Sequence, residues 1–241
     1  MNTAVAKSIF VKDHDYKYNP EGGISFERHY TKDKISPFEM FEYELRTSII
    51  RETSGKTIFE MNNVEVPKTW SQVATDILAQ KYFRKTGVPQ YNLDGSPKLD
   101  AKGQPMFGAE TSIKQVAHRM AGTWRYWAEK YGYFATAQDA QIFYDELVYM
   151  IINQMVAPNS PQWFNTGLNW AYGINSSPQG HYYTNEETGD TKLAEDAYTH
   201  PQPSACFIQA VKDDLVNEGG IMDLWVREAR LFKYGSGTGT N

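Results

Sequence analysis

Apolar residues recur at helical spacing in three stretches in the middle of the chain. One stretch starts at Thr69, a suitable N-cap, and ends at Gly87-Val88-Pro89. Two more start near Ser112 and near Ala137, and each places its large apolar residues on one stripe. We therefore predict three helices that pack through their apolar faces.

Less regular patterns flank these helices in the first half. The first 35 residues are polar and aromatic and predict an extended arm with a short strand or two. Phe41, Leu45 and Ile49 recur at a spacing of four, which predicts a helix over Phe38–Arg51. Residues 90–108 are rich in turn formers and predict a turn-rich loop or a small hairpin.

The pattern changes near Ala157. A short apolar piece between turn residues occupies 162–167, and the polar residues 172–203, rich in Gly, Ser, Thr and Pro, predict a surface insertion. Residues 205–211 are almost continuously apolar and bounded by turn formers, which predicts a buried strand.

A helix is predicted after that strand, capped by Asn217 or a neighbour and ended by Gly235 in a left-handed conformation. Its predicted inward face consists of Ile221, Leu224, Trp225, Ala229 and Phe232. The Gly/Thr alternation of residues 235–240 is typical of the start of another strand, so we expect the sequence to stop inside a fold.

The composition narrows the possible classes of protein. With 24 Lys+Arg and 29 Asp+Glu, the 241 residues carry a net charge of −5, which does not favour nucleic acid or anionic lipid as partners. No apolar run reaches the roughly 18 residues of a membrane helix, and Met1–Phe10 shows no secretory signal. A single cysteine excludes an internal disulfide and a multi-thiolate metal cluster, so the cytoplasm is the expected compartment.

The residues alone offer few candidates for chemistry. The glycine run at 235–239 lacks the strand–glycine–helix order of a dinucleotide site, so a flexible loop is the simpler interpretation. Cys206, in an apolar strand, is by itself more typical of a buried structural residue. Asp213-Asp214 suits an acidic helix start or a carboxylate that binds a ligand. The five histidines show no metal-ligand spacing, and no metal site is predicted.

Four motifs in a fixed order resemble one family. They are Pro158-Asn159-Ser160-Pro161 with Phe164-Asn165, then Ser204-Ala205-Cys206-Phe207, then Asp213-Asp214, then the run from Phe232 to Asn241. Together they closely resemble the catalytic chain of ribonucleotide reductase, and in detail its adenosylcobalamin-dependent (class II) enzymes. The stretch from Trp70 to Ala74 is also similar to that class.

The resemblance implies an α/β fold in two parts. A largely helical N-terminal domain over residues 1–155 would lead into the first part of a ten-stranded α/β barrel over residues 156–241. The strand at 205–211 would be the first of an incomplete barrel. Because open strand edges and an incomplete core would result, we expect the chain to be poorly soluble and inactive alone.

The resemblance also implies roles for single residues. Cys206 matches the catalytic redox cysteine, which is oxidised to a disulfide as the ribose 2′-hydroxyl leaves. Ser160, Ala205 and Gly237 match positions that hold the ribose and phosphates of the substrate. Asp213 matches a residue that binds the nucleotide effector controlling substrate choice.

The implied reaction reduces ribonucleotides to deoxyribonucleotides for DNA synthesis, through a thiyl radical generated from adenosylcobalamin. The implied partners are a ribonucleotide substrate, a dNTP or ATP effector, a thioredoxin-like dithiol reductant, the C-terminal part of the same enzyme and a second copy in a homodimer. The expected enzyme is a ribonucleoside-diphosphate reductase, although the sequence does not distinguish a diphosphate from a triphosphate substrate.

The chain departs from the family's pattern in its cysteines. The family needs one partner cysteine for the disulfide and another for the thiyl radical, and this chain has only Cys206. Most cobalamin contacts are expected outside these residues, and no ATP-cone pattern is present. Two alternatives stay open, namely a fragment of a class I large subunit, whose radical comes from a separate metal-containing subunit, and a non-catalytic nucleotide-binding or assembly module.

Overall fold

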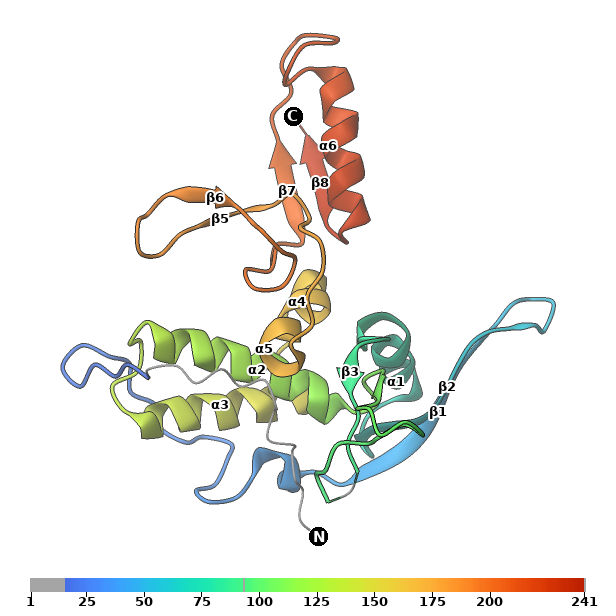
Figure 1. Ribbon diagram of the computed structural model, residues 1–241, viewed down its shortest axis with the longest axis vertical. Coiled ribbons are helices and arrows are strands. Elements are labelled where there is room, and N and C mark those ends of the chain that lie inside the picture. Colours follow the sequence, from blue (N-terminus) through green and yellow to red (C-terminus); the bar gives the residue numbers. More distant parts are fainter. Residues whose placement is uncertain (1–15, 93, 241) are drawn as a thin grey trace. The chain divides into compact units, whose positions relative to one another are not determined.

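The computed structural model describes residues 16–92 and 94–240, and the chain divides into two compact units (Figure 1). Unit 1 comprises Met1–Ala157 and Gly167–Ile174, and unit 2 comprises Pro158–Thr166 and Asn175–Asn241. Helices and strands are mixed along the chain, which confirms the predicted α/β class. The part of the predicted arm before residue 16 lies outside the described residues.

Unit 1 is built on a pair of helices, α2 (Ile113–Lys130) and α3 (Ala137–Ile152), which lie side by side (Figure 1). Both begin where the sequence predicts. Ser112 caps α2 in a capping box, because its hydroxyl accepts a hydrogen bond from Lys114 N while the side chain of Gln115 accepts one from Ser112 N. At the start of α3 the hydroxyl of Thr136 accepts from Asp139 N.

The core of unit 1 is formed by apolar side chains of these two helices, by Val64, Val66 and Val88, and by the short helix α5 (Leu168–Tyr172). The large aliphatic side chains with 0–1% exposure in this core are Val64, Val66, Val88, Ile113, Val116, Met120, Val148, Ile151, Ile152 and Leu168. Burial of large aliphatic side chains of this kind contributes roughly 1.5–3 kcal/mol each. The predicted stripes supply Ile113, Val116, Met120 and Ile151, and the other large side chains of this core lie outside those stripes.

The helix predicted from Thr69 is confirmed, with different ends. It consists of α1 (Gln72–Ile77), followed by a π-helical turn, η2 (Leu78–Tyr82). Ser71 rather than Thr69 is the cap, since its hydroxyl accepts from Ala74 N at 3.1 Å. The helical turns end at Tyr82, before the predicted stop at Gly87.

The predicted helix over Phe38–Arg51 is wrong. Pro37–Met40 forms a single 3₁₀ turn, η1, and β1 (Tyr43–Arg51) pairs antiparallel with β2 (Thr57–Pro67) in a long hairpin (Figure 1). A spacing of four fits both periods, because residues four apart share a helix face and also share a strand face. Leu45 and Ile49 lie on an exposed face of this hairpin, at 64% and 39% exposure, and not in a core.

Of two smaller predictions in unit 1, the hairpin is confirmed, and the N-terminal arm is confirmed as extended but without the predicted short strand in its described part. Residues 88–108 form a hairpin in which β3 (Val88–Pro89) pairs antiparallel with β4 (Phe107–Gly108). The described part of the N-terminal arm is extended and makes a single bridge, between Ile24 and Phe134.

Unit 2 contains a strand–helix–strand element in which β7 (Cys206–Gln209) and β8 (Gly237–Thr240) are parallel neighbours joined through α6 (Ile221–Lys233), as Figure 1 shows. The glycine run therefore does begin a strand, and Gly235 has the predicted left-handed conformation at φ +86°. The other elements of unit 2 are α4 (Ser160–Asn165) and the short β5 (Tyr182–Thr184) and β6 (Thr191–Leu193) hairpin within the predicted insertion.

Burial in unit 2 differs from the prediction. Cys206 is exposed and Ile208 is 86% exposed, so the predicted strand exists but is not buried. The apolar face of α6 is also open, with Trp225 at 64% and Phe232 at 58% exposure. The physical reason is that β7 has β8 as its only strand neighbour among the described residues, and α6 has no buried residue.

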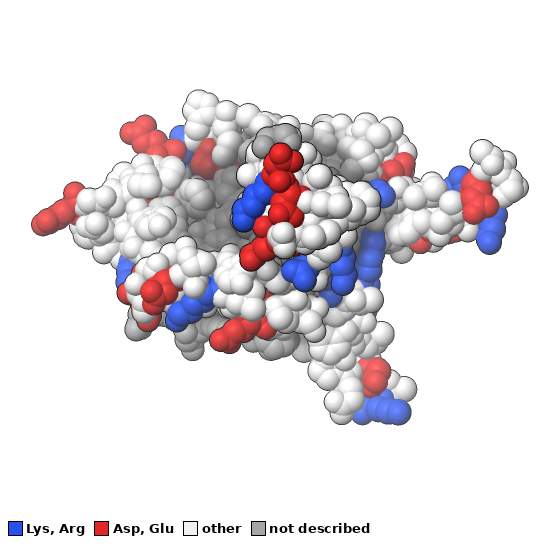
Figure 2. Space-filling model, turned by 90° about the horizontal axis from the view of Figure 1, so that it is seen from above, with Lys and Arg blue, Asp and Glu red and all other residues white. Residues whose placement is uncertain are grey.

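Within the described ranges the strands form four two-stranded sheets and no closed barrel. The ten-stranded barrel therefore stays a prediction. No helix in the described part of the chain combines the length and the apolar character needed to span a bilayer. On the face drawn in Figure 2, acidic and basic side chains are interspersed, without a broad patch of one sign.

Candidate functional site

The parallel pair β7–β8 brings three of the five predicted site residues together. Cys206 is the register partner of Gly237, and Gly237 N donates to the carbonyl of Ala205 at 2.6 Å. A Cβ atom placed on Gly237 would lie 3.9 Å from the Sγ atom of Cys206. The thiol and both predicted substrate-binding backbone positions therefore lie at one place, at the start of the two strands.

The Cys206 thiol is free and exposed. The interpretation as a buried structural cysteine, which the sequence alone favoured, is therefore wrong. An exposed thiol can meet a substrate or a second thiol, and both redox and acid chemistry require such access.

The fourth predicted residue, Ser160, is the first residue of α4, after the N-cap Asn159. This helix is tied to both sides of the strand pair. Asn165 Nδ2 donates to the carbonyl of Gln202 at 3.1 Å, just before β7. A Cβ on Gly235, just before β8, would lie 3.3 Å from the ring of Phe164.

The fifth predicted residue, Asp213, is not part of this group. It lies in the exposed loop that follows the C-terminal end of β7, whereas Ala205 and Gly237 lie at the N-terminal ends of their strands. The loop is well defined by hydrogen bonds, since Asp214 Oδ1 accepts from Val216 N and Asn217 N. The side-chain amide of Asn217 and these backbone groups hold the pKa of Asp214 below its usual range.

The acidic pair does not start a helix. Helix α6 begins at Ile221 after the N-cap Gly220, so neither Asp213-Asp214 nor Asn217 caps it. The acidic residue of its first turn is Asp223, whose Oδ2 accepts from Gly219 N at 2.8 Å. Asp213 keeps an exposed carboxylate that the helix does not use.

Sequence reasoning missed two polar residues next to the strand starts. Gln202 Nε2 donates to the carbonyl of Ser204 and to the hydroxyl of Ser236, both at 2.9 Å. The Ser236 hydroxyl in turn donates to the carbonyl of Ser204 at 2.8 Å. No residue type marks them in the sequence, because Gln and Ser are common in surface loops.

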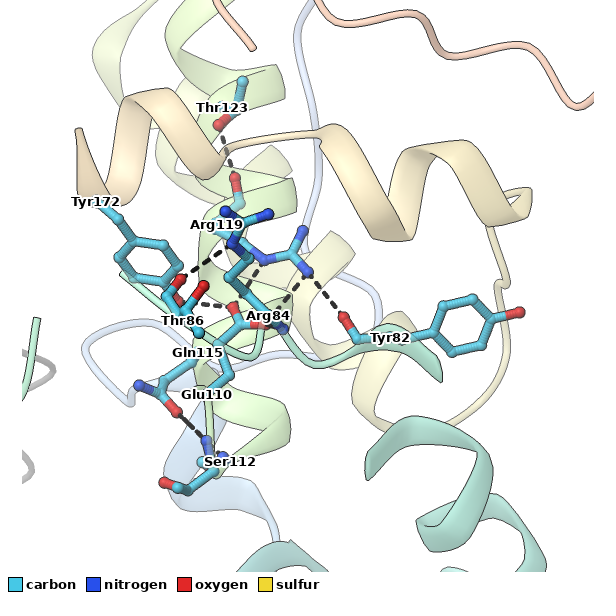
Figure 3. Close-up of polar contacts among 10 residues, drawn as sticks. Tyr82, Arg84, Thr86, Glu110, Ser112, Gln115, Arg119, Thr123 and Tyr172 are labelled. Atoms are coloured by element: carbon cyan, nitrogen blue, oxygen red, sulfur yellow. Dashed lines mark hydrogen bonds and ion pairs between the residues drawn. The ribbon is translucent and has the colours of Figure 1, made fainter. Parts of the chain in front are cut away.

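Unit 1 contains a buried polar cluster that the sequence also did not reveal (Figure 3). Arg119 Nε donates to Glu110 Oε1 at 2.7 Å, and both side chains have 0% exposure. Tyr172 Oη donates to the same Glu110 oxygen at 2.8 Å, and Arg84 N donates to Oε2 at 2.8 Å. The Glu110 carboxylate is therefore fully surrounded by donors from α2, α5 and the segment after η2.

This cluster is structural in character. Burial, and next the charge of Glu110, raise the pKa of Tyr172 well above its ordinary value. The hydroxyl therefore stays protonated and acts as a donor. The residues are separated by 9 and 62 positions along the chain, so no local motif signals them.

A half-buried pair joins α2 to α3. His118 Nδ1 lies 2.7 Å from Tyr144 Oη, and burial lowers the pKa of His118 to about 4. The imidazole is therefore neutral at pH 7.

The described residues do not fit a cobalamin site. Two cavities of about 710 and 670 Å³ are lined entirely by residues of unit 1, one by the hairpin between Asn92 and Met106 and one by residues between Arg28 and Glu39 with α3. Neither contains the thiol, and no cluster of three or more His, Cys, Asp or Glu side chains suited to a metal ion occurs in the described ranges.

Comparison with known proteins shows what this chain is similar to. Residues 44–154 match the family model described as class II vitamin B12-dependent ribonucleotide reductase. The vitamin B12-dependent ribonucleotide reductase of Bradyrhizobium diazoefficiens is 56% identical over 234 residues, which cover 90% of this chain and 19% of that relative. The enzymes of the same name from Agrobacterium fabrum and Rhodopirellula baltica are 52% and 37% identical, over 90% and 91% of this chain.

The chain spans about a fifth of the length of these relatives. The resemblance stated from the sequence is confirmed: the chain is related to the N-terminal region of class II, vitamin B12-dependent ribonucleotide reductases.

Proposed function

Since the chain is related to the class II reductases, we propose that it forms the part of such an enzyme that holds the ribonucleotide against the reducing thiol of Cys206. One observation carries the proposal: the register of β7 and β8 pairs the exposed Cys206 with Gly237, and Gly237 N binds the carbonyl of Ala205. A substrate bound to the backbone at Ala205 and Gly237 would lie next to the thiol.

The chemistry assigned to Cys206 is that of one half of a dithiol. The ribose 2′-hydroxyl leaves as water and is replaced by hydrogen, while two thiols lose two electrons and form a disulfide. Cys206 is the only cysteine of this chain, so the second thiol and the radical-bearing cysteine come from the C-terminal part of the enzyme. A thioredoxin-like dithiol then reduces the disulfide.

The cofactor of this reaction is adenosylcobalamin, which supplies the initiating radical when bound. Its contacts lie outside the described residues. The substrate is a ribonucleoside diphosphate, and the compartment is the cytoplasm. Production of deoxyribonucleotides for DNA synthesis is the biological role.

Two more residues complete the proposed site. Ser160, at the start of α4, binds the substrate's ribose or phosphate through its hydroxyl. Asp213, in the exposed loop after β7, accepts hydrogen bonds from the nucleotide effector. The separation of Asp213 from the strand starts supports this division, because a regulatory nucleotide needs a place apart from the substrate.

A chimera tests the proposal. The region of the Bradyrhizobium diazoefficiens reductase that matches this chain is replaced by residues 1–241, and conversion of ribonucleoside diphosphates is measured with and without adenosylcobalamin. We expect activity that depends on adenosylcobalamin and on an added dithiol. Cys206→Ser is expected to abolish it, and Asp213→Ala is expected to abolish the response to effector while sparing basal turnover.

Other outcomes have defined meanings. A chimera that retains full activity with Cys206→Ser contradicts the catalytic assignment. Activity that needs a metal-containing subunit in place of adenosylcobalamin would indicate the class I alternative. Effector binding that survives Cys206→Ser, in a chimera without turnover, would favour a non-catalytic module.

A further inference from the structure

The side chain of Gln202 binds both backbone polar groups of a single residue, Ser204, ahead of β7. Its Oε1 accepts from Ser204 N, and its Nε2 donates to Ser204 O at 2.9 Å. Both backbone polar groups of Ser204 are therefore bound by one amide. Such a pair of bonds fixes the orientation of the backbone as a turn hydrogen bond would.

The Ser236 hydroxyl binds the same carbonyl from the other strand. It donates to Ser204 O at 2.8 Å and accepts from Gln202 Nε2 at 2.9 Å, and Ser236 is 5% exposed. The next residue continues the contact, because Gly237 N donates to Ala205 O at 2.6 Å. The Ser236 hydroxyl and the Gly237 amide thus hold two successive carbonyls before β7, those of Ser204 and Ala205.

These bonds determine how Ala205 is presented. The Ser204–Ala205 peptide is planar and trans, so its N–H points opposite to its carbonyl. With the carbonyl fixed toward Gln202 and Ser236, the N–H of Ala205 faces away from them. The next peptide, Ala205–Cys206, is oriented by Gly237 N, which binds the carbonyl of Ala205, so the backbone on both sides of Ala205 is fixed ahead of Cys206.

We propose that Gln202 and Ser236 form a clamp that orients the Ser204–Ala205 peptide, and that this clamp positions the Ala205 amide and the Cys206 thiol for the reaction. The clamp rests on the proposed function for its role in turnover. Gln202 and Ser236 are positioning residues, since they act through the peptide and not on the substrate. Nothing in the residues' own chemistry requires them to touch the nucleotide.

The clamp is also connected to the helix that carries Ser160. The backbone carbonyl of Gln202 accepts from Asn165 Nδ2 at 3.1 Å, and Asn165 is the last residue of α4. Asn165 is 5% exposed, so this bond is shielded from solvent. Gln202 therefore connects the start of β7, the start of β8 and α4 through its hydrogen bonds.

Hydrogen exchange on the chimera described above tests the structural claim. In Gln202→Leu and Ser236→Ala, we expect the Gly237 amide to exchange at least about 10-fold faster, because its strand register loses the adjoining bonds. The amide of Ala117 inside α2 is expected to be unchanged, which shows that the chain is still folded. Gln104→Leu, a substitution of an exposed glutamine in the hairpin of residues 88–108, is the matched control and should change neither amide.

Turnover in the chimera tests the positioning role. A displacement of reacting groups by about 1 Å can cost about 100-fold in rate, so we expect kcat to fall at least about 10-fold in both clamp variants. Ser236→Thr retains the hydroxyl and should keep kcat and Gly237 exchange within about 3-fold of the unaltered protein. Gln104→Leu should leave kcat unchanged.

The outcomes separate the two proposals. Unchanged Gly237 exchange in both clamp variants, or unchanged kcat, overturns the clamp. A loss of kcat that Ser236→Thr shares also overturns it, because the hydroxyl is then irrelevant. An inactive chimera with the unaltered sequence refutes the proposed function instead, and the exchange measurement, which needs no turnover, still decides whether the clamp holds the peptide.

Discussion

Arg119 Nε lies 2.7 Å from Glu110 Oε1, and neither side chain reaches solvent. Removing two charges from water costs several kcal/mol per ion, and mutual attraction offsets this only when the remaining polar atoms are also bonded. Tyr172 Oη and Arg84 N provide two of these bonds. The stability of the ion pair therefore depends on Tyr172 of α5, a helix that begins at Leu168, well after α2 ends at Lys130.

Breaking this pair should destabilise unit 1 strongly. Arg119→Met leaves the Glu110 carboxylate buried without its charge partner, which typically costs about 3–5 kcal/mol. Urea unfolding followed by far-UV circular dichroism measures the effect. Lys68→Met is the control, because Lys68 and Glu42 form an exposed pair at 2.9 Å, and no measurable change is expected. Equal effects of the two substitutions would contradict the role of burial.

Stability should fall in mild acid because of His118. Its pKa is about 4 in the folded chain, below the ordinary value of 6.5, so the unfolded chain takes up a proton first as the pH falls. Stability is complete above pH 6.5 and decreases between pH 6.5 and 4, by about 2 kcal/mol between pH 7 and 5.

The check is urea unfolding at pH 7 and pH 5, above the range in which ordinary carboxylates titrate. His118→Gln removes the titrating group and should flatten the difference between the two pH values. A variant that keeps the full difference would show that another group is responsible.

Two glycines with the same backbone conformation should respond differently to alanine. Gly167 and Gly55 have φ of +85° and +86°. A Cβ at Gly167 would lie 2.2 Å from the carbonyl oxygen of Arg119, whereas one at Gly55 meets nothing within 4 Å. Gly55→Ala should cost only the left-handed strain of about 1–2 kcal/mol, and Gly167→Ala should cost at least about 1–3 kcal/mol more. Thermal unfolding of both variants compares them directly, and similar Tm values would refute the crowding.

Backbone amides of the N-terminal arm should lose protection from exchange when the Glu146 carboxylate, which binds the arm, is removed. Glu146 accepts hydrogen bonds from Tyr30 N, Thr31 N and the Thr31 hydroxyl. In Glu146→Ala the buried N–H and hydroxyl of Thr31 and the part-buried N–H of Tyr30 lose their acceptor, at a cost of about 1–3 kcal/mol, and amide exchange at residues 30 and 31 should rise. Glu27→Ala, at an exposed carboxylate of the same arm, is the control and should leave both amides protected. Protection that survives in Glu146→Ala would assign the anchoring to other contacts.

The elements that sequence reasoning predicts well are those whose signals are local. Ser112 and Thr136 cap the helices they precede, and Gly235 adopts the left-handed conformation expected after a helix. The helix predicted over Phe38–Arg51 is wrong because the spacing of Leu45 and Ile49 suits a strand as well as a helix. Only the pairing of β1 with β2 decides between the two. Burial of Cys206 and Trp225 depends on neighbours far along the chain, which no local pattern reveals.

The candidate site shows the same division. The resemblance identifies Cys206, Ala205 and Gly237 by their motifs, and the structure brings these three residues together. The sequence does not single out Gln202 and Ser236, because what sets them apart is that both donate to the carbonyl of Ser204, a contact that only the structure shows. The buried Glu110 and Arg119 look like surface charges in the sequence, since charged residues are rarely fully buried.

The chain crosses between its two units after residues 157, 166 and 174, so neither unit is a continuous stretch. During synthesis on a ribosome, Glu110 and Arg119 emerge long before Tyr172, and unit 1 cannot assemble fully until residue 174 has left the exit tunnel. By then α4, which belongs to unit 2, has already emerged, but Gln202, which Asn165 of α4 binds, has not. A break in the gene at any single point between residues 158 and 174 would separate residues of one unit from each other, so these units could not be inherited or exchanged as independent modules.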